Sequence, residues 1–295
     1  MVSDDEQTVY WSWHLWFTDY EPSKSTDAER KGQIHQYISD AFQPGGTYEN
    51  KSMMDRNLGA TITGITGAIN QPKTTAEAVK YYGLMYQFGR KDPFVGSRDG
   101  TDNNFVRRYD ANGTEIKTLQ TAAGTTGTDS KLAYAVNNPL VFLTKGTGNW
   151  TTEKDGLWGE DGTKSVFDPC PPGWRVPLGG PDAKNNPWAG FRTGISSETD
   201  SGDSAWDGFA WKTSSVTGAA GRLYKNSGVQ AWYPASGTIY FTSGKLAFIG
   251  TNSPYWGAIP NDLSSSYYLD FTDSYVYPIA CFYRAYSFPV RCVQE

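Results

Sequence analysis

The stretch Thr75–Arg90 (TAEAVKYYGLMYQFGR) sets the first expectation for the fold, because it carries the strongest helical pattern in the chain. Thr75 can cap its start, and apolar or aromatic residues recur at intervals of three to four from Ala78 to Gly89. The pair Asp92–Pro93 stops a helix. The pattern therefore predicts a helix over residues 75–90.

Strand-like runs dominate the rest of the chain, each bounded by Gly, Asn, Asp or Ser. They are Val9–Phe17, Trp232–Tyr233, Thr238–Phe241, Lys245–Ile249, Tyr267–Phe271 and Phe288–Val293. In Lys131–Thr144 the apolar spacing is helical, but Pro139 favours a turn or a broken helix. The polar, Gly-rich stretches Ser97–Ser130 and Gly179–Ser204 predict long surface loops. Together these signals predict an α+β fold with one or two helices, a mainly antiparallel sheet and long irregular loops.

Composition narrows the class of protein. The 295 residues include 11 Trp, 19 Tyr and 14 Phe, which excludes a disordered or collagenous chain and predicts a core built from rings. A net charge of −5 argues against a nucleic-acid binder that neutralises phosphates. Because no linker-like stretch divides the chain, we expect a single domain over residues 1–295.

Membrane and export signals are missing from the sequence. No run approaches the roughly 18 apolar residues of a spanning helix, so we expect no membrane insertion by this chain. Met1–Tyr10 has neither the basic start nor the apolar stretch of a signal peptide.

The metal-binding and disulfide chemistry of the sequence is sparse. Cys170, Cys281 and Cys292 allow one disulfide and a third thiol, or three thiols, and none belongs to a metal-ligand motif. Asp99–Asn104 lacks the spacing of an EF-hand loop and reads as an Asx-rich turn. We therefore expect no metal ion and no cofactor.

Catalytic signals are equally weak. His14 is open to a catalytic or a structural role, and the structural role is favoured because no Ser or Cys motif supplies a nucleophile. Alternation along the strand would put His14 on one face with Ser12 and Trp16. A carboxylate pair of the glycosidase kind would meet only in space, so it stays open. Arg56 and Arg90 are predicted to be buried and paired with carboxylates and carbonyls.

Six motifs follow one another along the chain. They are Trp11–Trp16 (WSWHLW), Met54–Ala60 (MDRNLGA), Tyr82–Phe94 (YGLMYQFGRKDPF), Asp168–Pro177 (DPCPPGWRVP), Tyr233–Gly237 (YPASG) and Arg284–Val293 (RAYSFPVRCV). In sequence and order they resemble the Fibrobacter succinogenes major paralogous domain, over nearly the whole chain. Rings within the motifs, including Trp13 and Trp174, are then expected to belong to the scaffold.

The resemblance implies a C-type-lectin-like fold, related to that of formylglycine-generating enzymes, in exported or surface proteins of gut Bacteroides-type bacteria and some of their phages. Formylglycine-generating enzymes use a catalytic cysteine pair near the end of the fold. This chain has Cys281 and Cys292 in that region, but the surrounding motif is missing, so we do not expect it to share the enzymatic activity. The calcium-binding motifs of sugar-binding lectins are also missing. The resemblance implies a disulfide between Cys170 and Cys292, whereas Leu178–Pro181 departs from the family and argues against a second helix.

The segment Thr251–Tyr283 has an unusual composition. It contains no Lys, Arg, Glu, Gln or Met, although Lys and Arg alone number 26 in the chain. Its nine aromatic residues stand beside Ser, Asn and Gly, the mixture found in antibody loops, where rigid rings supply contact area at little entropic cost. For Tyr268 and Phe271 the alternation leaves both core and surface positions open.

The run Tyr277–Tyr283 follows no amphipathic period and directly precedes the last motif. It resembles the variable proteins of diversity-generating retroelements, which use C-type-lectin-like folds. Randomising the adenines of asparagine codons yields Tyr, Ile, Ala, Cys, Phe, Ser, Asp and Gly but never Lys, Glu, Gln, Met or Trp; the missing Arg is not explained this way. The predicted ligand-binding residues are Ser253, Tyr255, Ala258, Ile259, Asn261, Tyr275, Tyr277, Ile279, Cys281, Phe282 and Tyr283, with Trp256 among them as a scaffold residue.

We therefore expect a non-enzymatic recognition module at the cell surface, outside the cell or on a virion, which binds a protein or glycan ligand for adhesion or host-cell attachment. Binding through rings predicts little dependence on salt. An enzyme of the same fold would instead place convergent acids or a metal near His14. A structural pilus or tail-fibre subunit would show strand exchange or trimer contacts.

Overall fold

The computed structural model is built mainly from antiparallel strands. It describes residues 8–18, 20–22, 34–37, 39–61, 65–66, 68–69, 80–96, 108–109, 115–116, 119–123, 131–145, 149–152, 156–191, 209–213, 220–226 and 229–295. The helical elements that lie wholly within these ranges are short: the 3₁₀ turn η2 (Asp40–Phe42), the helix α2 (Leu132–Asn137) and the 3₁₀ turn η3 (Ala189–Phe191). In these ranges no helix has the length and apolar character needed to cross a bilayer. The predicted antiparallel sheet is confirmed, with less helix than expected.

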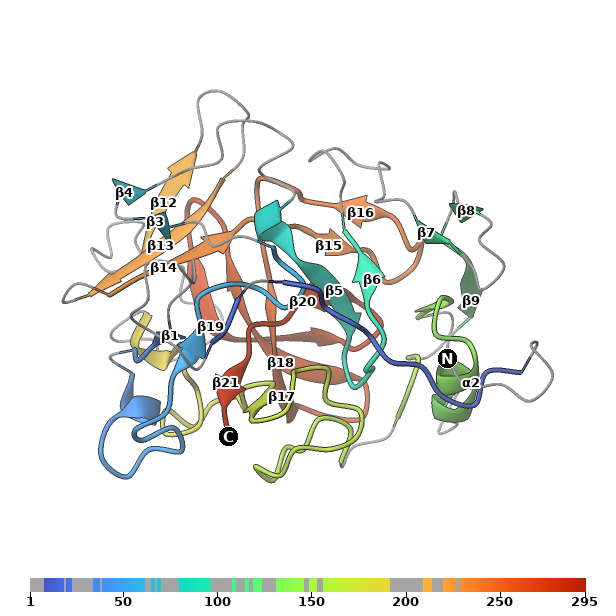
Figure 1. Ribbon diagram of the computed structural model, residues 1–295, viewed down its shortest axis with the longest axis horizontal. Helices are drawn as coiled ribbons and strands as arrows, with labels where there is room; N and C mark the ends of the chain where they lie inside the picture. The colour runs from blue at the N-terminus through green and yellow to red at the C-terminus, as the bar shows by residue number, and fades with distance from the viewer. Residues whose placement is uncertain are drawn as a thin grey trace.

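A five-stranded antiparallel sheet lies at the centre of the molecule (Figure 1). Its strands, in order, are β16 (Leu246–Ala247), β15 (Thr238–Ile239), β20 (Ser287–Pro289), β5 (Leu84–Gln87) and β6 (Phe94–Val95). Tyr86 of β5 lies opposite Phe288 of β20, and both are buried. This pairing brings an early and a late motif of the sequence together.

The helix predicted over Thr75–Arg90 is wrong from residue 83 onward. Residues 75–79 lie outside the described ranges, and residues 80–82 are helical. Gly83 then adopts a φ of 72°, and a Cβ at this position would lie 2.7 Å from the carbonyl oxygen of Leu58. The chain turns there and continues as β5, because pairing with β20 outweighs a local preference for helix.

The remaining strands form smaller sheets. One three-stranded sheet contains β12 (Phe209–Thr213), β13 (Ala220–Asn226) and β14 (Val229–Pro234), and another contains β17 (Tyr255–Pro260), β18 (Ser265–Phe271) and β19 (Val276–Tyr283). A four-stranded sheet contains β1 (Ile34–His35), β2 (Met53–Met54), β21 (Val293–Gln294) and β11 (Trp174–Arg175). Two-stranded pairs are β3 (Ile65–Thr66) with β4 (Ala68–Ile69), β7 (Arg108–Tyr109) with β8 (Glu115–Ile116), and the parallel pair β9 (Thr121–Ala123) with β10 (Phe142–Thr144). In Figure 1, β12–β14 extend to the upper left, and α2 and β9 lie at the right.

The segment Lys131–Thr144 forms a helix, a turn and a strand, as Pro139 predicts. Arg90 holds the turn, because it donates from Nη1 to the carbonyl of Val141 (2.8 Å) and from Nη2 to the carbonyl of Pro139 (3.3 Å). Burial lowers the pKa of Arg90 to about 10. The predicted role of Arg90 as a buried arginine paired with carbonyls is confirmed.

Aromatic rings dominate the core, as the composition predicts. The largest side chains with less than 2% exposure include four tryptophans and four arginines, namely Trp150, Trp158, Trp188, Trp256, Arg56, Arg222, Arg284 and Arg291. The prediction for Arg56 is confirmed, since its Nε lies 2.8 Å from Oδ1 of Asp55. Trp188 and Phe191 enter the core from within Gly179–Ser204, so the described part of that stretch is not the predicted surface loop. Most of Ser97–Ser130 and all of residues 192–204 lie outside the described ranges.

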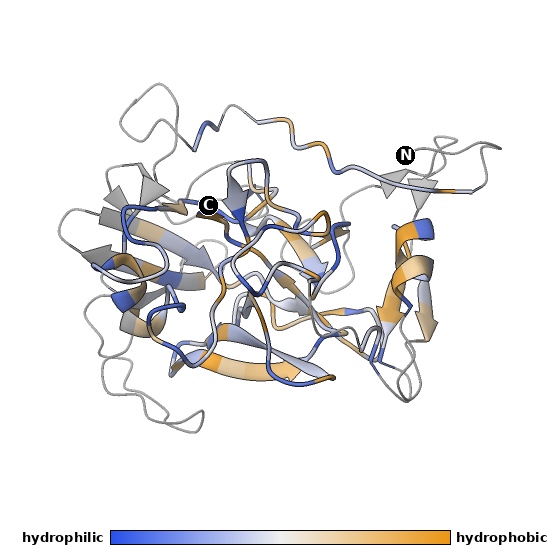
Figure 2. Cartoon of the chain, turned by 90° about the horizontal axis from the view of Figure 1, so that it is seen from below, coloured by the Kyte–Doolittle hydropathy of each residue, from blue (hydrophilic) through white to orange (hydrophobic). Residues whose placement is uncertain are grey.

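The segment Val9–Phe17 is not the predicted strand. Within the described chain it makes an isolated bridge at Trp11, and Figure 2 shows it running along the outside of the molecule. Alternation still operates, because Ser12 is buried and Trp13 is 61% exposed. Trp13 is therefore solvent-exposed and not the buried scaffold residue expected from its motif.

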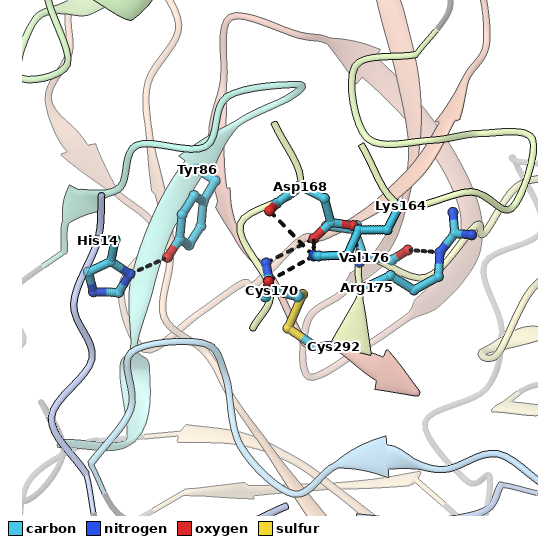
Figure 3. Close-up of a disulfide and its surroundings, with 8 residues drawn as sticks. All are labelled: His14, Tyr86, Lys164, Asp168, Cys170, Arg175, Val176 and Cys292. Atoms are coloured by element: carbon cyan, nitrogen blue, oxygen red, sulfur yellow. Dashed lines mark hydrogen bonds and ion pairs between the residues drawn. A yellow bond between two sulfur atoms is a disulfide. The ribbon is translucent and has the colours of Figure 1, made fainter. Parts of the chain in front are cut away.

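Cys170 and Cys292 form a disulfide that closes a loop of 122 residues, and this is the pair implied by the family resemblance. The bridge ties the chain before β11 to the chain before β21 (Figure 3). Restricting the unfolded chain in this way stabilises a protein by about 2–4 kcal/mol.

Candidate ligand-binding surface

The sheet β17–β18–β19 presents the predicted variable segment. β18 is the central strand, so in the described chain β19 has a sheet neighbour on one side. Cys281, Phe282 and Tyr283 of β19 lie opposite Tyr267, Ser266 and Ser265 of β18, and the register shifts between Tyr268 and Asp270. Successive side chains of β19 point to opposite faces of the sheet. The predicted residues are therefore divided between two faces.

Four predicted ligand-binding residues are buried: the surface assignment is wrong for three of them, whereas burial agrees with the scaffold role expected of Trp256. They are Ser253, Tyr255, Trp256 and Ala258. Tyr255 donates its hydroxyl to the carbonyl of Pro234 (3.0 Å) and stacks on Phe271, with ring centroids 5.8 Å apart. Trp256 donates from Nε1 to the carbonyl of Tyr86 (2.8 Å). These rings satisfy their polar atoms inside the protein and support the central sheet.

The other eight candidates reach the surface at least in part. They are Ile259, Asn261, Tyr275, Tyr277, Ile279, Cys281, Phe282 and Tyr283. Tyr275 and Tyr277 stack, with ring centroids 4.5 Å apart. The Tyr283 ring packs edge-to-face on Phe282, with centroids 4.7 Å apart, and the Nζ of Lys145 lies 4.2 Å from the Tyr283 centroid. The accessible candidates thus form two ring contacts, Tyr275 with Tyr277 and Phe282 with Tyr283.

A cavity of about 600 Å³ opens beside Tyr275 and Phe282, and we call it the Asp270 pocket. Its lining is Thr238, Phe248, Thr251, Asn252, Pro254, Tyr268, Asp270, Thr272, Asp273, Ser274, Tyr275, Phe282, Tyr286 and Phe288. Phe288 and Tyr286 are buried and form its deeper wall, whereas Phe282 is 41% exposed. The pocket combines buried aromatic walls with an accessible rim.

The Asp270 pocket is acidic. Oδ1 of Asp270 accepts from Nδ2 of Asn252 (2.6 Å), and Oδ2 accepts from the hydroxyl of Tyr275 (3.0 Å). Burial raises the pKa of the Asp270 carboxyl above its usual value. Burial, reinforced by the nearby carboxylate, also raises the pKa values of Tyr275 and Tyr268, so both phenols stay neutral at physiological pH. The lining contains no Lys or Arg among the described residues.

The rings of the pocket are inclined to one another. The Tyr268 and Phe288 centroids are 5.0 Å apart with an interplanar angle of 57°, and the Phe282 and Tyr286 centroids are 5.4 Å apart at 58°. Phe248 completes the rim, where it is 52% exposed and has a φ of 62°. A bulky residue in the left-handed region is strained, and such strain concentrates at functional sites.

A larger cavity of about 1010 Å³, which we call the His14 pocket, lies beneath the N-terminal segment. His14 Nδ1 lies 3.4 Å from the hydroxyl of Tyr86, and burial lowers the pKa of the imidazole. Asp168, also in the lining, accepts from Nζ of Lys164 (2.7 Å). Figure 3 shows His14 pointing to Tyr86, whereas Asp168 faces the backbone of Cys170 and Val176.

The lysine and carboxylate groups at the His14 pocket are already engaged within the protein. The amides of Cys170 and Val176 each donate to Asp168 at 2.8 Å. The Nζ of Lys91 donates to the carbonyl of Ser12 (2.9 Å) and lies 2.8 Å from Oδ1 of Asp92. The described residues hold no group of three or more His, Cys, Asp or Glu placed to bind a metal ion. The Asp99–Asn104 turn lies outside the described ranges.

Sequence reasoning missed several residues of the Asp270 pocket. Phe248 and Asn252 come from the turn before β17, and Tyr286 and Phe288 belong to a motif read as scaffold. Tyr268 and Asp270 are two residues apart on β18, so their shared face could have been read from strand alternation. Of the two residues left open, Phe271 is buried in the core, and Tyr268 is half-buried in the pocket wall.

Comparisons of this chain with protein-family models, with curated proteins and with solved structures found no match.

Proposed function

We propose that the chain is a non-enzymatic recognition module with a C-type-lectin-like fold of the Fibrobacter succinogenes paralogous kind. Its ligand would be a protein or a glycan on a cell surface. The observation that carries this proposal is the Asp270 pocket, which opens beside Tyr275 and Phe282 of the predicted variable segment. Exposed rings beside a concave apolar wall are the features of a binding site.

The composition of β19 supports a diversified surface. Five residues of this strand share no chemical character, and each is accessible to a partner at least in part. Phe282 is exposed, and the half-buried ones are Tyr277, Ile279, Cys281 and Tyr283. Substitution at exposed and half-buried positions generally costs a fold less than substitution in the core. A template repeat beside the coding sequence, differing from it only at adenines, would establish diversification. Its absence from the locus would exclude that origin.

An extracellular or cell-surface location, or a place on a virion, fits the same proposal. The Cys170–Cys292 disulfide supports it, since structural disulfides persist in oxidising compartments and are rare in the cytosol.

An enzyme is the second candidate, and the His14 pocket is the observation that favours it. It is the larger of the two cavities. However, its lysine and carboxylate side chains are bound to one another or to the backbone. A general acid or base needs a group free to exchange a proton with substrate. Recognition therefore agrees better with the geometry.

Binding of the fluorescently labelled chain to intact bacterial cells tests the proposal. We expect saturable binding, with at least tenfold weaker binding after Phe282→Ala and Tyr277→Ala together and no change in melting temperature. The matched control is Tyr134→Ala on α2, because Tyr134 is 40% exposed and lies outside the pocket. Raising the salt concentration from low to moderate should weaken binding less than tenfold.

Two outcomes would contradict recognition by this surface. One is equal loss of binding in the Tyr134→Ala control. The other is binding that the double variant retains in full, which would place the ligand site elsewhere on the chain.

A further inference from the structure

Each buried carboxylate of the described residues forms an ion pair with a lysine or arginine side chain. Asp55 pairs with Arg56 (2.8 Å), Asp92 with Lys91 (2.8 Å), and Asp168 with Lys164 (2.7 Å). This is the expected arrangement, since a desolvated charge is costly unless it is paired. In each case the protein supplies the positive charge from a residue near in sequence.

Asp270 departs from this arrangement. It is half-buried in its pocket, and its hydrogen-bond donors are all neutral: the side chains of Asn252 and Tyr275 and the backbone amide of Phe271. No Lys or Arg of the described chain lines the cavity. A carboxylate offers about four acceptor positions, so these three donors leave acceptor capacity unused. The pocket therefore holds a carboxyl group that no cationic side chain of its described lining pairs with.

The walls around this charge suit a cation that is large and weakly hydrated. Tyr268, Tyr286, Phe288, Phe282 and Phe248 line the cavity with ring planes inclined to one another. The face of an aromatic ring attracts a cation, by about 2 kcal/mol where water is excluded. Small metal ions require several convergent oxygen ligands, and no group of three or more His, Cys, Asp or Glu among the described residues is placed to supply them.

We propose that the Asp270 pocket binds an organic ammonium group, with an alkylated ammonium of the choline type preferred over a primary amine. A primary ammonium brings three donors that each need an acceptor. A quaternary ammonium needs none and presents methyl groups to the rings. The inference deepens the proposed recognition function by naming the class of ligand that this face takes.

The direct test compares choline with 3,3-dimethyl-1-butanol, its neutral isostere, by isothermal titration calorimetry on the full chain. The two probes have the same shape, so burial of apolar surface contributes equally. We expect choline to bind at least tenfold more tightly than the alcohol, and ethanolamine to bind more weakly than choline. Equal affinities for choline and the alcohol would overturn the proposal, as would the absence of binding by either.

Two variants separate the carboxylate from the rings. Asp270→Asn keeps the shape of the side chain and removes its charge, and we expect it to lower choline affinity about tenfold and leave the alcohol unchanged. Phe282→Leu keeps an apolar wall and removes a ring face, so choline should lose about threefold and the alcohol should not. Tyr134→Leu is the control outside the pocket. Unchanged choline affinity in both pocket variants would overturn the assignment.

The source of the ammonium group is a separate arm of the test. Phosphatidylcholine vesicles and phosphatidylglycerol vesicles distinguish a lipid head group from a free quaternary amine. Binding to the former alone, lost in Asp270→Asn, supports the head group, and binding to free choline alone supports a soluble ligand. If Phe282→Ala and Tyr277→Ala abolish cell binding while no ammonium compound binds, recognition stands and the ammonium inference fails.

Discussion

The His14 pocket and the Asp270 pocket are both lined by aromatic rings and carboxylates, yet the two differ in how their charges are balanced. In the first, Asp168 faces Lys164 and two backbone amides. In the second, Asp270 accepts from the side chains of Asn252 and Tyr275 and from the backbone amide of Phe271, and no cationic side chain of the described lining faces it. A cavity whose charges are balanced internally is explained by the fold alone. A cavity whose carboxyl group has no cationic partner can pair with a charged ligand. The smaller cavity is the better candidate for that reason.

The largest expected effect comes from Asp168→Asn. This isosteric change leaves Lys164 without its carboxylate and turns an amide toward the backbone donors of Cys170 and Val176. Breaking a buried pair in this way costs about 3 kcal/mol, measured as the free energy of unfolding in urea. The same substitution at Asp270 is the matched comparison and should not destabilise the protein. Similar losses at both positions would remove the distinction between the pockets.

The disulfide gives the next largest effect, and it belongs to the His14 side of the molecule, since Cys170 lines that pocket. Cys292→Ser should lower the free energy of unfolding by about 2–4 kcal/mol and leave choline affinity unchanged. Reductant should produce the same shift in the parent chain and none in the variant. Cys281→Ser is the control, because Cys281 lies on β19 outside the bridge. A stability loss in that control equal to that of Cys292→Ser would contradict the assignment.

Patterns of neighbouring residues predicted much of the scaffold. Alternation located β18, the proline at 139 separated α2 from β10, and a flanking acid or small residue identified Arg56 and Arg90 as buried. Each of these depends on interactions within a few residues, which a sequence displays directly.

Long-range pairing explains the failures. β5 carries a helical spacing, but it becomes a strand because β20, some 200 residues later, supplies its hydrogen bonds. Tyr255 lies in the segment whose composition is typical of a binding surface, yet Pro234 and Phe271 enclose it. Phe248 joins the pocket through a turn whose left-handed conformation no local pattern revealed. The candidate site was therefore located by segment, and by residue at Tyr275 and Phe282 alone.

A smaller effect is expected from Phe248→Gly at the rim. Glycine adopts the left-handed conformation without strain, and the turn keeps its bonds, because the amides of Thr251 (3.1 Å) and Asn252 (3.0 Å) donate to the backbone carbonyl of residue 248. The free energy of unfolding should stay constant or rise by at most about 1 kcal/mol, while choline affinity falls about threefold. Leu263→Gly, at a residue 53% exposed, is the control and should lose stability. A clear destabilisation by Phe248→Gly would show that the ring serves packing and not binding.

The smallest effect is the pH dependence of stability that Asp270 contributes. Burial raises its pKa in the folded protein, so the folded state holds this proton more strongly than the unfolded state, whose value is about 3.9. The contribution of Asp270 to stability therefore falls as the pH rises from about 4 through the raised folded pKa. Of the other titratable groups in the pocket, Tyr268, Tyr275 and Tyr286 have raised pKa values and stay protonated there, and Asp273 is exposed.

Asp270→Asn should remove this dependence, so the variant equals the parent chain at pH 3.5 or below and is more stable at pH 7. Thermal unfolding of both chains across that range measures the difference, and Asp273→Asn, at the exposed rim, is the control. Saturating choline should stabilise the parent chain at pH 7 and not the variant, because the ligand supplies the missing positive charge. If the variant is instead less stable than the parent at pH 7 without ligand, the carboxylate is a structural acceptor and the two pockets are alike.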